Sequence, residues 1–243
     1  MPRRFKILPF ALAIVVLGIF AASCGSGNTK YQLVSAIADT PTGGFDITLN
    51  GSAMFSGVGF QMAEPSPTSY KGISSGSDTL EVFLAGQTAN PIINSALNLS
   101  SGNQYTVIMM GEYSERGTTN QFAPAVQPFT DDNTAPTSGN GKFRIINASP
   151  SAPSGSPDIY IVPPGTDINN VNATFPALAY GQKSTYQSET AGNYSVIVTP
   201  QGNKTQYLTQ NYALSSGQIY TVVLVDVPNG GALGTPILLT DLQ

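Results

Sequence analysis

One heptapeptide occurs twice in this chain, as LSSGNQY from Leu99 and as LSSGQIY from Leu214. Each copy runs directly into an apolar segment of strand character, TVIMM after the first and TVVLV after the second. The copies lie about 115 residues apart, which is the size of one small domain. A duplication over this distance predicts two tandem copies of one fold rather than one larger domain.

The heptapeptide has a physical interpretation as a corner between two strands. Its Leu would pack inward, its Gly would turn with a left-handed backbone, and its Tyr would open the next strand. In immunoglobulin-like sandwiches a tyrosine at such a corner hydrogen-bonds to backbone just upstream. We therefore expect Tyr105 and Tyr220 to close the same corner of two β-sandwiches.

Short strand patterns separated by turn residues run through both halves of the chain. Alternating Phe45, Ile47 and Leu49 predict a half-buried strand, and Asn50-Gly51 after it predicts a tight hairpin turn. Regularly spaced short strands without helical periodicity indicate a sandwich. In the second half we expect strands at residues 143–147, 158–162, 185–187, 194–199, 207–212 and 220–227.

The fold prediction is therefore all-β, with two tandem immunoglobulin-like antiparallel β-sandwiches after a cleaved N-terminal signal helix. Each sandwich would have roughly 100 residues, enough to bury a core without disulfides. The expected boundaries are a signal peptide at 1–23, a flexible tether at 24–30, a first sandwich at 31–137, a linker at 138–141 and a second sandwich at 142–243.

Two stretches of the first half each allow two interpretations. Met54, Phe55, Phe60 and Met62 form a soft apolar cluster, which is either core beneath a bulged strand or an exposed binding patch. The irregular stretch 112–128 carries a compact charge group and is either a solvated loop or a functional one.

The first 23 residues have the layout of a secretory signal: a basic start, an apolar stretch from Ile7 to Ala22, and small residues before Cys24. The apolar stretch is shorter than the ~20 residues of a membrane-spanning helix. The segment FAASCGSG resembles the lipobox of bacterial lipoproteins, which implies that the Cys24 thiol is diacylated and becomes the new N-terminus. Ordinary secretion and a retained membrane helix are the alternatives.

The start of the second half resembles a bacterial domain family of unknown function. Members begin with a strand, followed by His-Ala-Ser-Pro-x-Ala-Pro and then Asp-Val-Tyr. Here FRIINASPSAP and SPDIYIV match this opening, with Asn147 where the family usually has His. The first half matches this opening motif more weakly, at Thr40-Pro41 and Asp46-Ile47. The resemblance implies a β-sandwich on envelope and secreted proteins, and it brings no established catalytic residues.

Composition excludes several classes of function. Beyond residue 23, seven Lys and Arg stand against fourteen Asp and Glu, which argues against nucleic-acid binding. The chain has no His, the usual general base and zinc ligand. Asp131-Asp132-Asn133 lacks the ligand spacing of a calcium loop. We predict no metal and no cofactor.

Catalysis by two carboxylates remains open, because glycoside hydrolysis needs only such a pair. Asp158 is the best-placed acid, although an Asp at a strand start after Pro157 more often caps turn backbone. The second candidate function is glycan binding through aromatic faces, and the second half supplies the tyrosines Tyr180, Tyr186, Tyr194, Tyr207, Tyr212 and Tyr220. The alternative is that these tyrosines fill half-buried strand positions.

These observations favour a lipid-anchored protein of the bacterial cell envelope with a structural or interaction role and no catalytic activity. Its partners would be a membrane, through the lipid on Cys24, and an envelope protein or glycan. We expect it on the extracytoplasmic side, with the outer membrane or cell surface favoured. A glycan-binding module and a carboxylate-dependent hydrolase are the alternatives.

Overall fold

The computed structural model describes residues 29–241. Strands make up its regular structure, together with two single-turn 3-10 helices, η1 (Tyr113–Glu115) and η2 (Ile168–Asn170). No helix within the described part of the chain has the length and apolarity to cross a membrane. The expected signal peptide and Cys24 lie outside the described residues.

The first half forms a sandwich of two sheets. Its inner sheet has the strand order β4-β1-β8-β9, with β5 also pairing with β1, and its outer sheet has the order β3-β2-β6-β7. The strands are β1 (Lys30–Ser35), β2 (Phe45–Leu49), β3 (Ser52–Val58), β4 (Ala63–Glu64), β5 (Lys71–Gly72), β6 (Gly76–Leu84), β7 (Ile93–Leu99), β8 (Gln104–Met110) and β9 (Ala125–Thr130).

The second half repeats this plan. Its inner sheet has the order β12-β10-β15-β16 and its outer sheet the order β11-β13-β14. The strands are β10 (Asn140–Asn147), β11 (Asp158–Val162), β12 (Gln187–Thr190), β13 (Gly192–Thr199), β14 (Leu208–Leu214), β15 (Ile219–Leu224) and β16 (Ile237–Thr240). The prediction of an all-β chain with two tandem sandwiches is confirmed.

One detail of the prediction is wrong, because the inner sheets are mixed and not purely antiparallel. β1 pairs with β8 in parallel, and β10 pairs with β15 in parallel. In each half the chain crosses to the outer sheet and back between the two strands of the pair. A parallel pair requires a long crossover of this kind, whereas a hairpin would force antiparallel pairing.

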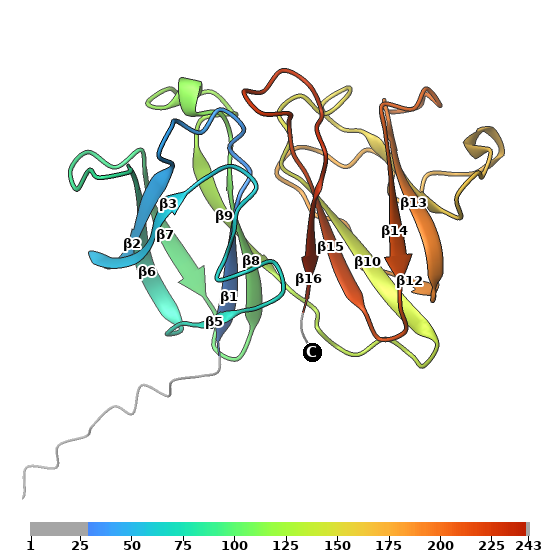
Figure 1. The fold of residues 1–243 in the computed structure, drawn as a ribbon, viewed down its shortest axis with the longest axis horizontal. Helices are drawn as coiled ribbons and strands as arrows, with labels where there is room; N and C mark the ends of the chain where they lie inside the picture. The colour runs from blue at the N-terminus through green and yellow to red at the C-terminus, as the bar shows by residue number, and fades with distance from the viewer. Residues whose placement is uncertain (1–28, 242–243) are drawn as a thin grey trace, which may run out of the picture.

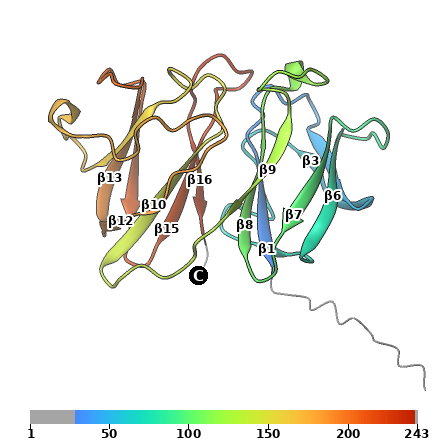
Figure 2. The ribbon, with the colours of Figure 1, turned by 180° about the vertical axis from the view of Figure 1, so that it is seen from behind.

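The two sandwiches stack into four layers, with the inner sheets facing each other (Figures 1 and 2). One apolar cluster fills each sandwich. A third cluster lies between the inner sheets and comprises Val34, Ala36, Ile108, Met110, Phe129, Ile146, Ala148, Val223, Val225, Ile237 and Leu239. The inner sheets are therefore buried on both faces, and the two sandwiches share a continuous hydrophobic interface.

The tyrosine corners are present in both halves. The backbone N–H of Ser100 donates to the Tyr105 hydroxyl at 2.9 Å, and the Tyr220 hydroxyl donates to the carbonyl of Ala213 at 3.1 Å. The glycine of the second heptapeptide, Gly217, has φ +85° and makes the left-handed turn. The corner prediction is confirmed.

The soft apolar cluster of the first half divides between three environments. Met54 and Phe55 pack against the core of the first sandwich, beneath an irregular β2–β3 pairing. Phe60 packs instead into the interface between the sandwiches, and Met62 is 41% exposed. Core packing beneath a bulged strand thus holds for the first two residues only.

Candidate functional site at the junction of the sandwiches

A buried arginine lies at the interface between the sandwiches. Side chains alternate along β10, so Phe143 and Ile145 enter the core of the second sandwich while Arg144 and Ile146 point toward the first. Arg144 is fully buried. Because burying an isolated guanidinium costs several kcal/mol, its neighbours must compensate the charge.

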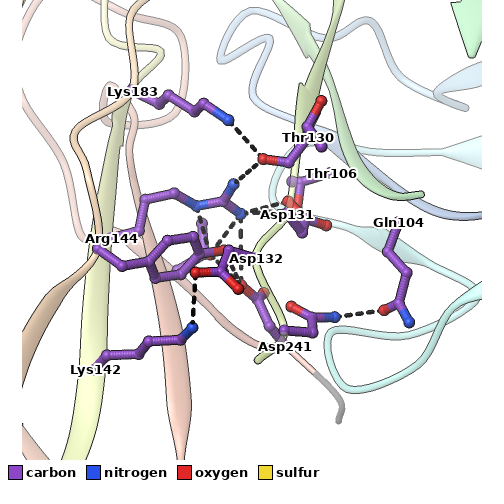
Figure 3. Close-up of polar contacts among 12 residues, drawn as sticks. Gln104, Thr106, Thr130, Asp131, Asp132, Lys142, Arg144, Lys183 and Asp241 are labelled. Carbon is purple, nitrogen blue, oxygen red and sulfur yellow. Dashed lines mark hydrogen bonds and ion pairs between the residues drawn. The ribbon is translucent and has the colours of Figure 1, made fainter. Parts of the chain in front are cut away.

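Two carboxylates, one from each half of the chain, share this cation (Figure 3). The Nη2 atom of Arg144 lies 2.7 Å from Oδ1 of Asp131 and 3.5 Å from Oδ2 of Asp241. Asp131 directly follows β9 and Asp241 directly follows β16, and both side chains are fully buried. Arg144 therefore joins the last strands of the two sandwiches.

Two threonines hold the guanidinium in place. The Thr221 hydroxyl accepts from Nε at 3.1 Å and from Nη2 at 2.7 Å, and the Thr106 hydroxyl accepts from Nη2 at 3.1 Å. Each threonine also donates to a carboxylate, Thr106 to Asp131 at 3.0 Å and Thr221 to Asp241 at 2.8 Å. Four oxygens thus compete for the two hydrogens on Nη2, and the network shares them.

Two tyrosines complete the arrangement. The Tyr70 hydroxyl donates to Asp131 at 2.8 Å, and the Tyr186 hydroxyl donates to Asp241 at 2.7 Å. The ring of Tyr186 lies 4.8 Å from Cζ of Arg144 in a cation–π contact. Burial raises the pKa of both phenols, and the neighbouring carboxylates raise it further. Both tyrosines therefore stay neutral and donate.

The charges in this network do not balance, since one guanidinium faces two carboxylates. Burial alone would lower the pKa of Arg144, but the charges around it, that of Asp131 first, raise the pKa overall. Burial raises the pKa of Asp241 to about 6, although Arg144 acts in the opposite direction. The second carboxylate thus takes up a proton under mildly acidic conditions.

Two lysines flank the network, the buried Lys142 and the exposed Lys183, and an open hollow of about 580 Å³ lies beside it. The Lys183 ammonium donates to the carbonyl of Thr130 at 2.5 Å, and the same carbonyl accepts from Nη1 of Arg144 at 3.3 Å. The Lys142 ammonium lies 3.3 Å from Asp132. We call Arg144 with Asp131 and Asp241 the clamp between the two sandwiches. The two lysine contacts extend this clamp to the edge of the interface.

The three residues Asp131-Asp132-Asn133, considered above as a calcium loop, all bind other side chains of the protein. Asn133 donates from Nδ2 to Oε1 of Gln104, while Asp131 and Asp132 bind Arg144 and Lys142. The triplet therefore serves the junction. No group of three or more metal-ligating side chains occurs within residues 29–241.

Asp158, the candidate acid, is a backbone cap. Its Oδ1 accepts from the N–H of Ala177 at 2.9 Å and its Oδ2 accepts from the N–H of Gly202 at 2.8 Å. The residue is 7% exposed. The expectation that this Asp caps turn backbone is confirmed.

The family position Asn147 is also structural in this chain. It is fully buried at the end of β10. Its Nδ2 donates to the carbonyl of Leu178 at 2.9 Å and its Oδ1 accepts from the N–H of Ser149 at 3.2 Å. Asn147 thereby fixes the chain that follows the strand.

The tyrosines of the second half do not form one exposed row. Tyr212 and Tyr220 are buried in the core, Tyr186 belongs to the Arg144 network, and Tyr207 is 63% exposed. In the loop 112–128, the guanidinium of Arg116 stacks 4.1 Å from the ring centroid of Tyr113.

The sequence signals missed Arg144 and Tyr70, and they singled out Tyr186 only as a candidate for glycan binding. The repeat itself held a usable signal, because each corner tyrosine is followed by a threonine, Thr106 or Thr221, and each half ends in Thr-Asp. These duplicated polar residues lie among apolar neighbours, which marks them as partners of a buried polar group.

Comparisons with known proteins place this architecture in context. The family model described as "Domain of unknown function (DUF4397)" matches residues 31–154 and again residues 155–242. No curated protein matches the sequence significantly. Among solved structures, the Bacillus anthracis TIE protein is 10% identical with a TM-score of 0.27, over 81% of this chain and 33% of that one.

A leucine-rich repeat protein from Bacteroides thetaiotaomicron is 10% identical with a TM-score of 0.21, over 83% of this chain and 26% of that one. The chain thus spans about a third or less of the length of these two structures.

Proposed function

The chain belongs to the DUF4397 family, whose function is unknown, and from this premise we propose that it is a lipid-anchored protein of the bacterial cell envelope with a structural or interaction role. In this proposal Cys24 carries the lipid, and the tether expected at 24–30 joins it to the first sandwich. Two or three acyl chains on one residue give a stable membrane anchor, whereas a single chain binds only marginally.

The observation that carries the structural role is the shared interface. The third apolar cluster and the buried Arg144 network join the two sandwiches into one body. Backbone contacts reinforce the junction: Asn229 donates to the carbonyl of Ala38, and Thr240 donates to the carbonyl of Pro67, both at 2.9 Å. A body of this kind suits a spacer or a rigid platform for interactions.

The direction of the strands supports an outward-facing platform. β1 starts at the end of the molecule where β16 finishes, and the loop with η1 lies at the opposite end (Figure 1). A tether joined to β1 would hold the first end near the membrane. The loops around η1, and the loop between β15 and β16, would then face away from it.

A Cys24→Ser substitution tests the anchor. The wild-type protein should enter the detergent phase and incorporate labelled palmitate, and the variant should do neither. Ser23→Ala is the matched control, because it keeps a small residue before the cysteine and should leave lipidation intact. Equal membrane partitioning of the Cys24→Ser protein would refute the anchor.

A further inference from the structure

The outer faces of the two sandwiches differ in what covers them. In the second sandwich, Tyr160 and Ile197 on the outer face are 2% and 4% exposed. They pack against Ile168 of η2 and against neighbours in the segment 163–176 that follows β11. In the first sandwich a tight turn at Asn50-Gly51 joins β2 to β3, so the loop after β2 is too short to make such a cover.

Two aspartates align these faces residue by residue. Asp46 accepts from the N–H of Gly86 at 2.7 Å, just as Asp158 accepts from the N–H of Gly202 at 2.8 Å. Asp46 and Asp158 are the first polar residues of the equivalent strands β2 and β11. The sequence Gly86-Gln87-Thr88 therefore corresponds to Gly202-Asn203-Lys204, and Thr88 stands where the second half has Lys204.

The outer face of the second sandwich has a hollow of about 360 Å³, and Lys204 lines it together with Asp158 and Tyr160. The Lys204 ammonium donates to the Tyr160 hydroxyl at 2.9 Å and to the carbonyl of Val171 at 2.6 Å. It also lies 4.6 Å from the centroid of the Tyr160 ring. In this half the protein itself supplies an aliphatic stem and a cation to the face.

The first sandwich has a hollow of about 310 Å³ at the corresponding place, where Thr88 stands in place of the lysine. Phe83 and Ala53 give it apolar walls, and Asp46 and Glu81 give it two carboxylates. Its lining contains no Lys or Arg and comprises Asp46, Ile47, Thr48, Gly51, Ala53, Phe55, Ser56, Glu81, Phe83, Gln87 and Thr88.

Glu81 retains capacity to bind a cation. Its carboxylate accepts from the Thr48 hydroxyl at 3.2 Å and from Nδ2 of Asn94 at 3.5 Å, both at the long end for hydrogen bonds. No basic side chain pairs with it within residues 29–241. The hollow therefore combines apolar walls with the negative charge of Glu81, which has no basic partner within residues 29–241.

We propose that this hollow receives a lysine or arginine side chain from a segment of another protein. The aliphatic stem would pack against Phe83 and Ala53 while the cation reaches Glu81, much as the Lys204 side chain lines the equivalent hollow of the second sandwich. Charge complementarity favours a basic partner, because acidic residues outnumber basic ones two to one beyond residue 23. The inference deepens the proposed interaction role.

Thr88→Lys tests the proposal by giving the hollow a lysine of its own, at the position where Lys204 lines the hollow of the second sandwich. The processed full chain in detergent is titrated with the peptide acetyl-Gly-Ile-Lys-Val-Gly-amide, and its backbone amide signals are followed by NMR. In the wild type, the signals of Ala53, Glu81 and Thr88 should shift with saturable binding. In Thr88→Lys the affinity should fall at least tenfold, whereas Thr88→Gln should keep it.

Two controls separate charge from shape. Glu81→Gln should weaken binding at least fivefold, and the peptide with Glu in place of Lys should not shift the hollow signals. The proposal is overturned if Thr88→Lys binds like the wild type, if both peptides bind equally, or if only an oligosaccharide shifts these signals. Membrane partitioning has a separate readout, so a negative result here leaves the anchor standing.

Discussion

Gln32 and Arg144 occupy equivalent positions in the two inner sheets, but only Arg144 has polar partners. Gln32 lies opposite Thr106 in the β1–β8 pair, and Arg144 lies opposite Thr221 in the β10–β15 pair. Neither amide atom of Gln32 has a hydrogen-bond partner within residues 29–241. The junction is therefore symmetric in its threonines, carboxylates and tyrosines but asymmetric at its centre, where one guanidinium serves both halves.

Replacing Arg144 by Met should destabilise the protein strongly. The substitution keeps much of the volume but leaves Asp131 and Asp241 buried without a cation, which typically costs about 3–5 kcal/mol. Urea unfolding followed by tyrosine fluorescence measures the change in free energy. Arg116→Met is the control, because Arg116 lies at the surface and its loss should cost under about 1 kcal/mol. A similar loss in both variants would contradict the clamp.

Replacing Gln32 by Met should stabilise the protein. A buried amide without partners carries a desolvation cost of about 1–3 kcal/mol, and an apolar side chain of similar length removes it. The unfolding midpoint in urea should therefore rise with an unchanged slope. Gln61→Met is a suitable comparison, since the Gln61 side chain donates to the carbonyl of Thr235 at 2.9 Å and its loss should not stabilise. A lower midpoint for Gln32→Met would show that the amide has a partner.

Asp241 should make the junction more stable in mild acid. Its pKa of about 6 in the folded protein exceeds the value of about 3.9 in an unfolded chain. The folded state therefore binds more protons between these values, and this contribution is fully present below about pH 4 and is lost as the pH rises through about 6. The expected loss is roughly 1–3 kcal/mol.

The measurement compares the wild type with Asp241→Asn in urea from pH 4 to pH 8. Asparagine does not titrate, so the difference in unfolding free energy between the two proteins should change between about pH 4 and pH 6 and level off at higher pH. A difference that stays flat over this range would show that Asp241 keeps one protonation state.

Local patterns predicted most of the fold. The alternation in β2, the turn at Asn50-Gly51 and the corner tyrosines each depend on residues close together in sequence. Such signals survive because the side-chain period and the turn geometry are properties of short segments. The repeated heptapeptide in addition predicted that both halves of the chain have the same fold.

The junction between the sandwiches could not be predicted from local sequence patterns. Which residues meet across the interface follows from how two finished sandwiches pack, so Arg144 resembled any polar residue in a strand. One indication was present: β8 and β15 are apolar at successive positions, as with Ile108 and Val223 on the face turned away from each core. Strands buried on both faces have this pattern, which predicts a partner for the second face.

Tyr220→Phe tests the corner that the sequence predicted. The Tyr220 hydroxyl donates to the carbonyl of Ala213 at 3.1 Å on a residue that is 8% exposed. Its removal leaves that carbonyl without this partner and should cost about 1 kcal/mol. Tyr207→Phe is the matched control, because Tyr207 is 63% exposed and should change the unfolding free energy by less than about 0.5 kcal/mol. Tyr105→Phe should repeat the loss in the first half, where Ser100 would lose its acceptor. Equal stability of the Tyr220→Phe and wild-type proteins would mean that the corner is held by ring packing alone.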